Sequence, residues 1–259
     1  IAREITVPRQ KSPMTRDFYE ASCSGNADEL WQMEQMLPVL AKRLASRMIL
    51  KHKHHQNGSI DFRRTMRQSM GQGGVPIDLV VRKKQRDNPI IFALCDVSWS
   101  CLQFSYFSLA IVYALEKFFR QVRSFAFIGI TDEITDLIKQ EACQNLRTQT
   151  LSQANVFGKS GYTDYGGALD SFFQQYGREL TPRSQVLIFG DARTNWFGTR
   201  TEILREIRDR AKRVYWFNPE PQSDWGTGDS SMLAYQKYCH QVFACANLEQ
   251  LAQAICVID

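Results

Sequence analysis

Short apolar runs and amphipathic segments alternate along the last two thirds of this 259-residue chain. The apolar runs are rich in branched and aromatic side chains and have the length of buried strands. They predict strands at residues 90–95, 124–130, 185–189, 214–217 and 240–244. Between them, apolar positions recur at helical spacing and predict helices at 103–120, 138–151, 165–176, 201–212, 230–237 and 248–255. Such alternation is typical of an α/β domain with a mainly parallel sheet and helices on both faces. Residues 130–136 fit either a hairpin or a turn.

The part of the chain before residue 87 follows a different pattern. Residues 1–27 show no clear period and fit a loop or linker. Apolar side chains at spacings of three and four over residues 30–48 predict an amphipathic helix with a kink at Pro38. A short basic helix at 61–70 and a strand at 77–82 are expected to follow.

The charge distribution supports a boundary between these two parts. Residues 1–86 hold 16 Lys or Arg against 8 Asp or Glu, a net charge of +8, whereas residues 87–259 hold 16 against 19, a net charge of −3. We therefore predict a basic helical extension with a short strand or hairpin at 1–86 and the α/β domain at 87–259. The basic part could meet an acidic protein or a nucleic acid.

Composition bears on the cellular compartment. The chain has no run of about 18 apolar residues, which predicts the absence of a membrane span, and its start does not resemble a signal peptide. Its seven cysteines are an odd number and include no C-x-x-C pair. These features favour free thiols in a reducing compartment, and we expect a cytoplasmic protein.

Oxygen-bearing side chains follow two of the predicted strands. Asp96, Ser98 and Ser100 stand at alternating positions directly after the first strand, and Asp191 follows a later one. Groups beyond the carboxyl ends of parallel strands meet in one crevice, and a loop after an intervening helix brings Thr163 to the same edge. Two carboxylates and three hydroxyls are hard ligands of the kind that Mg2+ prefers, with waters completing its shell.

The order D-x-S-x-S, then a loop Thr, then a strand-end Asp resembles the metal-ion-dependent adhesion site of von Willebrand factor A domains. Further segments are similar to the CoxE-like family, from about residue 58 to the C-terminus: 61–67, 73–76, 190–193, 218–221 and 225–230. One position departs from that family, which usually has Gly where this chain has Trp99. A bulky ring beside the metal loop bears on the access of a partner to the site.

The resemblance implies a Rossmann-like von Willebrand factor A domain that binds a metal. It implies that the cation, Mg2+ or another divalent ion such as Mn2+ or Ca2+, is held by Asp96, Ser98, Ser100, Thr163 and Asp191. A partner protein would offer an acidic residue to the open position on the metal. The family works with MoxR-type AAA+ ATPases in the maturation or remodelling of client proteins, so the resemblance implies a metal-dependent, non-catalytic adaptor.

Other readings of the same residues are weaker. Asp and Ser after a strand are often a helix N-cap, so the metal hypothesis depends on the whole set of five residues. The tripeptide Gly158-Lys159-Ser160 is similar to the end of a Walker A loop, but Gln153 stands where its first Gly belongs. A metallohydrolase is an alternative, although no His lies near the candidate ligands in sequence to act as a base.

A nucleic-acid-binding module is the other alternative. Arg63, Arg64 and Arg67 stand at helical spacing and could contact phosphates. Phe62 is the one aromatic residue beside them, which disfavours base stacking and nucleic-acid recognition. The histidines at 52–55 are interleaved with lysines and predict a solvated basic loop rather than a transition-metal site.

Overall fold

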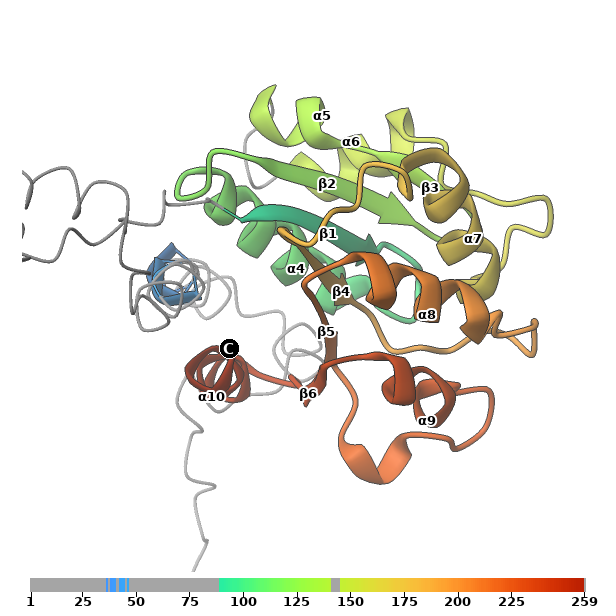
Figure 1. The fold of residues 1–259 in the computed structure, drawn as a ribbon. Helices are drawn as coiled ribbons and strands as arrows, with labels where there is room; N and C mark the ends of the chain where they lie inside the picture. The colour runs from blue at the N-terminus through green and yellow to red at the C-terminus, as the bar shows by residue number, and fades with distance from the viewer. Residues whose placement is uncertain are drawn as a thin grey trace, which may run out of the picture.

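A six-stranded sheet forms the centre of the protein, in the strand order β3-β2-β1-β4-β5-β6 (Figure 1). The strands are β1 (Ile90–Asp96), β2 (Val122–Phe127), β3 (Thr131–Glu133), β4 (Ser184–Phe189), β5 (Arg213–Asn218) and β6 (Gln241–Ala244). Neighbouring strands pair in parallel, except that β2 and β3 are antiparallel. The computed structural model describes residues 89–140 and 145–258 and, before them, positions 36, 38–40, 42–44 and 46.

Helices cover both faces of this sheet (Figure 1). One face carries α4 (Leu102–Glu116), α5 (Thr135–Gln140), α6 (Leu146–Gln153) and α10 (Leu248–Val257). The other face carries α7 (Tyr165–Tyr176), α8 (Thr201–Arg210) and α9 (Met232–Tyr235). Two short 3-10 helices, η2 (Gln222–Asp224) and η3 (Gln236–Tyr238), flank α9 in the chain. The predicted α/β class, with a mainly parallel sheet and helices on both faces, is confirmed.

Alternation along β1 decides which side chains reach which face. Ile91, Ala93 and Cys95 belong to the core under α4, whereas Phe92 and Leu94 belong to the core under α7. Because side chains alternate along a strand, the next even position, Asp96, faces the α7 side. Burial on both faces explains why the strands are continuous apolar runs in the sequence.

Most predicted elements are confirmed within a few residues, one open alternative is decided, and two predicted helices are corrected. Residues 130–136 form a hairpin, because β3 pairs antiparallel with β2. The single helix expected at 138–151 is replaced by α5 and α6, and α5 begins where the Thr135 hydroxyl accepts a hydrogen bond from the Ser124 amide. The helix expected at 230–237 is shorter, since α9 passes into η3 after Tyr235.

The extension is described only in part. The described positions between 36 and 46 are helical, in agreement with the predicted amphipathic helix, and Leu40 and Leu44 are buried in the core under α4. The loop predicted at 1–27, the helix at 61–70 with its arginines, and the strand at 77–82 lie outside the described residues. The proposed division of the chain at residue 87 therefore stays a prediction.

Two expectations about compartment can be compared with the described residues. None of the helices that the structure describes combines the length and the apolar character needed to cross a membrane. The cysteines among the described residues are free, and Cys256 is exposed whereas Cys95, Cys101, Cys239 and Cys245 are buried.

Candidate metal centre

Two carboxylates lie at the carboxyl edge of the sheet, on neighbouring strands. Asp96 is the last residue of β1, and Asp191 follows β4, which pairs with β1 in parallel. Both side chains are buried, with relative exposures of 0% and 2%. The parallel register therefore brings together two carboxylates that are far apart in the sequence.

Tyr165 joins these carboxylates. It is the first residue of α7, and its hydroxyl donates a hydrogen bond to Asp96 Oδ2 and lies 3.3 Å from Asp191 Oδ1. Its ring stacks on Trp216 of β5, with a centroid separation of 5.6 Å. The hydroxyl is seated against Gly190, where a Cβ would lie 2.1 Å from the Tyr165 oxygen. Only Gly leaves room for the hydroxyl at this position.

The loop after β1 turns back on its own carboxylate. The Ser98 amide donates to Asp96 Oδ1 at 2.8 Å, and the Ser98 and Ser100 hydroxyl oxygens lie 3.1 Å apart. Ser98 is buried and Ser100 is exposed, so polar oxygens lead from the buried carboxylate to the surface. Arg147 of α6 also contacts this loop, since its Nη2 donates to the Val97 carbonyl at 3.4 Å.

The loops that carry Thr163 and Asp191 are bonded to each other. Thr163 is buried, and its carbonyl accepts a hydrogen bond of 3.0 Å from Asn195 Nδ2. The next residue, Asp164, caps α7 by accepting a bond of 2.8 Å from the Gly167 amide. Sequence-distant segments thus form one layer over the ends of β1 and β4.

One oxygen of this layer has no partner within the described part of the protein. The Arg193 amide donates to Asp191 Oδ1 at 2.8 Å, but the buried Asp191 Oδ2 has no hydrogen-bond partner. An unpartnered buried carboxylate oxygen is costly unless a cation or proton satisfies it. Asp191 and Asp96 each have a ligand atom within 4.8 Å of the other, which is a spacing that one cation could bridge.

The whole chain was compared with known protein families and structures. A family model described as "VWA domain containing CoxE-like protein" matches residues 33–254, which is most of the chain. This chain belongs to the CoxE-like VWA family. The match begins at residue 33, earlier than residue 58, where the family similarity is expected to begin from the sequence. It therefore includes the described helical positions near Leu40.

Solved structures add little to this assignment. One similar chain is described as the crystal structure of Deinococcus radiodurans RO (RSR) protein, with 12% sequence identity and a TM-score of 0.43. The alignment covers 89% of this CoxE-like chain and 48% of that chain, so the present chain spans about half of its length. A search of curated proteins found no match.

Burial and mutual repulsion shape the acid–base properties of the site. Burial, followed by the nearby Asp191 carboxylate, raises the pKa of Asp96 from 3.8 to about 7. Burial also raises the pKa of the Tyr165 hydroxyl well above its ordinary value, and the two carboxylates act in the same direction. Tyr165 therefore stays protonated and available as a donor, whereas Asp96 changes charge near neutral pH.

Cys101 completes a compact group with the two carboxylates. One ligand atom from each of Asp96, Cys101 and Asp191 lies within 4.8 Å of the others. Burial, then the two carboxylates, raises the pKa of the Cys101 thiol well above its ordinary value. A neutral thiol is a poor ligand, because the thiolate is the form that binds metals. The group of Asp96, Cys101 and Asp191 could hold a metal ion.

The sequence did not single out Tyr165 or Cys101 as members of the site. Cys101 directly follows the D-x-S-x-S motif, which is a usable signal. A Tyr at the start of a helix carries no such signal, because its role depends on the register of β1 and β4. Of the predicted residues, Asp96, Ser98 and Ser100 are connected by hydrogen bonds, and Tyr165 links Asp96 to Asp191. The Thr163 carbonyl is bonded to Asn195, four residues after Asp191. The role of the predicted residues as metal ligands stays a prediction.

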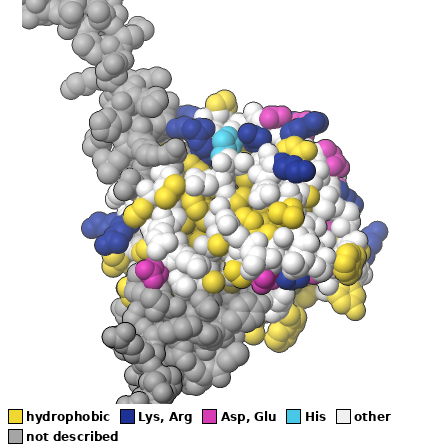
Figure 2. Space-filling view, turned by 90° about the horizontal axis from the view of Figure 1, so that it is seen from below, with side chains coloured by type: hydrophobic (Ala, Val, Ile, Leu, Met, Phe, Trp, Pro, Cys, Tyr) yellow, Lys and Arg dark blue, Asp and Glu magenta, His cyan; other side chains and the backbone are white. Residues whose placement is uncertain are grey.

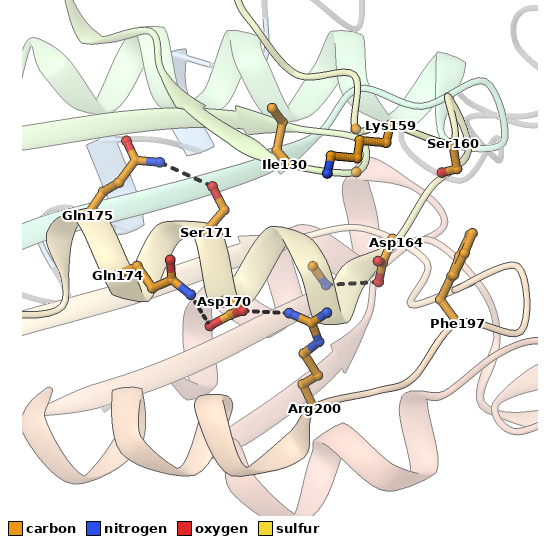
Figure 3. A pocket seen from close by; sticks show the side chains of 13 residues that line it. Ile130, Lys159, Ser160, Asp164, Asp170, Ser171, Gln174, Gln175, Phe197 and Arg200 are labelled. Carbon is orange, nitrogen blue, oxygen red and sulfur yellow. Dashed lines mark hydrogen bonds and ion pairs between the residues drawn. The ribbon is translucent and has the colours of Figure 1, made fainter.

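A groove of 630 Å³ lies beside the Thr163 loop, over the outer side of α7 (Figure 3). Its lining includes the side chains of Lys159, Ser160, Asp170, Gln174, Phe197 and Arg200. Arg200 forms an ion pair with Asp170, and Gln174 donates to Asp170 at 3.0 Å. The groove shares two segments with the candidate metal centre, those around Thr163 and Asn195.

Proposed function

We propose that this CoxE-like protein is a metal-dependent protein-binding adaptor, in which a bound cation receives a carboxylate from a partner. The observation that carries the proposal is the unpartnered Asp191 Oδ2, buried beside Asp96 at the edge where the parallel strands end. Two buried carboxylates this close repel each other, and a divalent cation would relieve that repulsion.

Each side chain has a definite part in holding the cation. Asp96 and Asp191 would supply negative charge, and Ser98, Ser100 and Thr163 would supply neutral oxygens. When bound, the cation supplies an electrophilic centre for one external carboxylate. The Tyr165 hydroxyl donates its proton to Asp96 and lies 3.3 Å from Asp191 Oδ1, while the Arg193 amide donates to Asp191, so both carboxylates are positioned before the cation arrives.

A non-catalytic role fits these contacts. The groups around the carboxylates are donors that hold them in fixed positions: the Tyr165 hydroxyl and the Ser98 and Arg193 amides. These bonds fix the orientation of both carboxylates, as a cation site requires. Membership of the CoxE-like family supports a protein partner, and we propose a MoxR-type AAA+ ATPase that acts with the adaptor on client proteins.

The test is capture of the partner by the immobilised full chain from a lysate of the source organism. We expect an AAA+ ATPase, identified by mass spectrometry, to be retained with Mg2+ and lost with EDTA or with Asp191→Asn. Asp209→Asn is the matched control, because Asp209 is an exposed carboxylate on α8, and it should capture as the native chain does. Equal capture in all lanes would contradict the proposal, and metal-dependent turnover of an ester or phosphoester would favour the metallohydrolase instead.

Mg2+ affinity should fall as the pH is lowered through the pKa of Asp96. Since the metal-free carboxylate has a pKa of about 7, a proton competes with the cation below that pH. We expect the apparent dissociation constant to rise about tenfold per pH unit below 7, as single-proton competition requires. Isothermal titration calorimetry with Mg2+ at pH 6 and pH 8 measures it, and equal affinities would show that Asp96 does not bind the ion.

A further inference from the structure

Three large aromatic side chains are exposed around the candidate metal centre. The relative exposures are 81% for Trp99, 65% for Tyr162 and 80% for Trp196. Each belongs to a different loop of the site: Trp99 stands between Ser98 and Ser100, Tyr162 precedes Thr163, and Trp196 follows the segment that begins at Asp191. We call these three residues the aromatic rim. By contrast, Trp216 and Trp225 are buried.

The rim gathers at one end of the molecule. Its three loops lie over the carboxyl ends of the strands, and the bond of Asn195 to the Thr163 carbonyl ties two of them together. Figure 2 shows hydrophobic side chains protruding at its right-hand edge, the side toward which β1 and β2 point in Figure 1. Exposed apolar groups that gather around a polar site mark an interaction surface more often than scattered ones do.

Trp196 is held outward by a strained backbone. Its φ angle is 64° and that of Asn195 is 47°, a region that bulky side chains rarely adopt. Two bonds brace the turn, since the Asn195 amide donates to Asp229 Oδ2 at 3.0 Å and the Phe197 amide donates to the Thr194 carbonyl at 2.9 Å. Strain of this kind costs roughly 1–3 kcal/mol per residue and is common at binding sites. A braced turn presents the indole in a fixed position, which lowers the entropy lost on binding.

We propose that the aromatic rim binds apolar side chains that flank the metal-bound carboxylate of an extended partner segment. This inference rests on the proposed function, because the cation selects the carboxylate and the rim then selects its neighbours. Trp and Tyr give large contact areas at small entropic cost and dominate many interfaces. When apolar residues flank the partner carboxylate, they can cover the rings of the aromatic rim while the carboxylate binds the cation. A carboxylate in a wholly polar segment would leave those rings exposed to water.

The groove has balanced charge, with Lys159 and Arg200 against Asp164 and Asp170, and Lys159 is the group in it that can pair with an acidic segment. Lys159 lines the groove beside Tyr162, is exposed, and has no ion pair within the described part of the chain. The groove also offers the polar side chains of Ser160 and Gln174, which can bond to a peptide backbone. We therefore place the continuation of the segment in this groove, with a second carboxylate near Lys159.

The test uses two fluorescent peptides with the full chain and Mg2+. One carries a central Asp between two Leu residues and the other a central Asp between two Ser residues, with the same acidic tail. We expect the Leu peptide to bind about tenfold more tightly by fluorescence polarisation, which corresponds to burying one apolar anchor. Trp99→Ala and Trp196→Ala should each remove that preference and leave the Mg2+-induced rise in melting temperature unchanged.

Controls separate the rim from the metal centre. Phe118→Ala removes an exposed ring just after α4, at the opposite edge of the sheet, and should keep the preference. Equal affinity for the two peptides, or no binding of either at millimolar concentration, would overturn the inference about the rim. If Mg2+ did not raise the melting temperature of the native chain, the proposed function would be overturned instead. Binding to lipid vesicles that requires the rim but not Mg2+ would also overturn the inference and assign the rim to a membrane surface.

Discussion

Replacing Asp96 with Asn should stabilise the metal-free protein at pH 8 and abolish the stabilisation that Mg2+ gives the native chain. At this pH the native Asp96 is charged, although burial and Asp191 raise its pKa from 3.8 to about 7. The neutral amide removes that repulsion, and Tyr165 can then donate to Asp191 Oδ1, 3.3 Å away. The rise of about three pKa units limits the gain to about 4 kcal/mol. Because the amide replaces the charged hydrogen bonds to Ser98 and Tyr165 by weaker neutral ones, we expect a net gain of about 1–2 kcal/mol, or roughly 2–8 °C in melting temperature.

The pH dependence of the native chain checks the same argument. The folded state keeps the Asp96 proton up to a pH of about 7, whereas the unfolded chain loses it near 3.8. Metal-free stability should therefore fall as the pH rises between these values, and the slope should be smaller in Asp96→Asn. Thermal melts with EDTA from pH 4 to pH 8 measure the slope, and Asp209→Asn should keep the native profile. Destabilisation by Asp96→Asn at pH 8 would show that the carboxylate is satisfied without a metal.

Gly190→Ala should destabilise the protein by about 3 kcal/mol, or roughly 6–12 °C, which is the upper range for overpacking a core. The new methyl group would lie 2.1 Å from the Tyr165 oxygen and 2.9 Å from Asp96 Cβ. Tyr165 cannot move aside easily, because its ring is stacked on Trp216. The displaced hydroxyl would also lose its hydrogen bond to Asp96, so Mg2+ binding should weaken. Thermal melts and calorimetry measure the two effects.

A second substitution tests whether the hydroxyl is the cause. In the Gly190→Ala background, Tyr165→Phe should recover at least half of the lost stability, since the nearest ring atom, Cζ, is 3.1 Å from the methyl position. Gly198→Ala is the matched control: no atom lies within 4 Å of its Cβ position, and we expect it to be neutral. If Tyr165→Phe added its own loss instead of restoring stability, the contact with Gly190 would not be the source of the effect.

The sequence predicted the sheet because its strands are buried on both faces. Apolar runs locate β1 and β4 to within one residue, and α7 agrees at both ends. Its start is marked by Asp164, a capping residue, and Gly177 follows its last turn. The start of α5 was predicted three residues too late, at 138, because periodicity does not show that Thr135 is bonded to the Ser124 amide of β2.

The candidate site was predicted less completely than the fold. Alternating oxygen ligands after a strand located Asp96, Ser98 and Ser100, because such a pattern depends on local sequence alone. The contact of Tyr165 with two carboxylates depends on how three elements meet, and no local pattern records it. The exposed position of Trp196 was also missed. Its backbone is left-handed, and a Gly, which usually signals that conformation in a sequence, is absent at this position.

The short outer strands of the sheet limit how a partner can bind. Among the described residues, the outermost strands β3 and β6 contain 3 and 4 residues, whereas the four strands between them contain 6 or 7. An edge this short offers few backbone groups to an incoming strand, which is a common way to prevent unwanted association. Strand addition to the sheet would therefore give a partner little affinity. A partner would therefore be recognised mainly by side chains on the loops, and substitutions there can change specificity without altering the sheet.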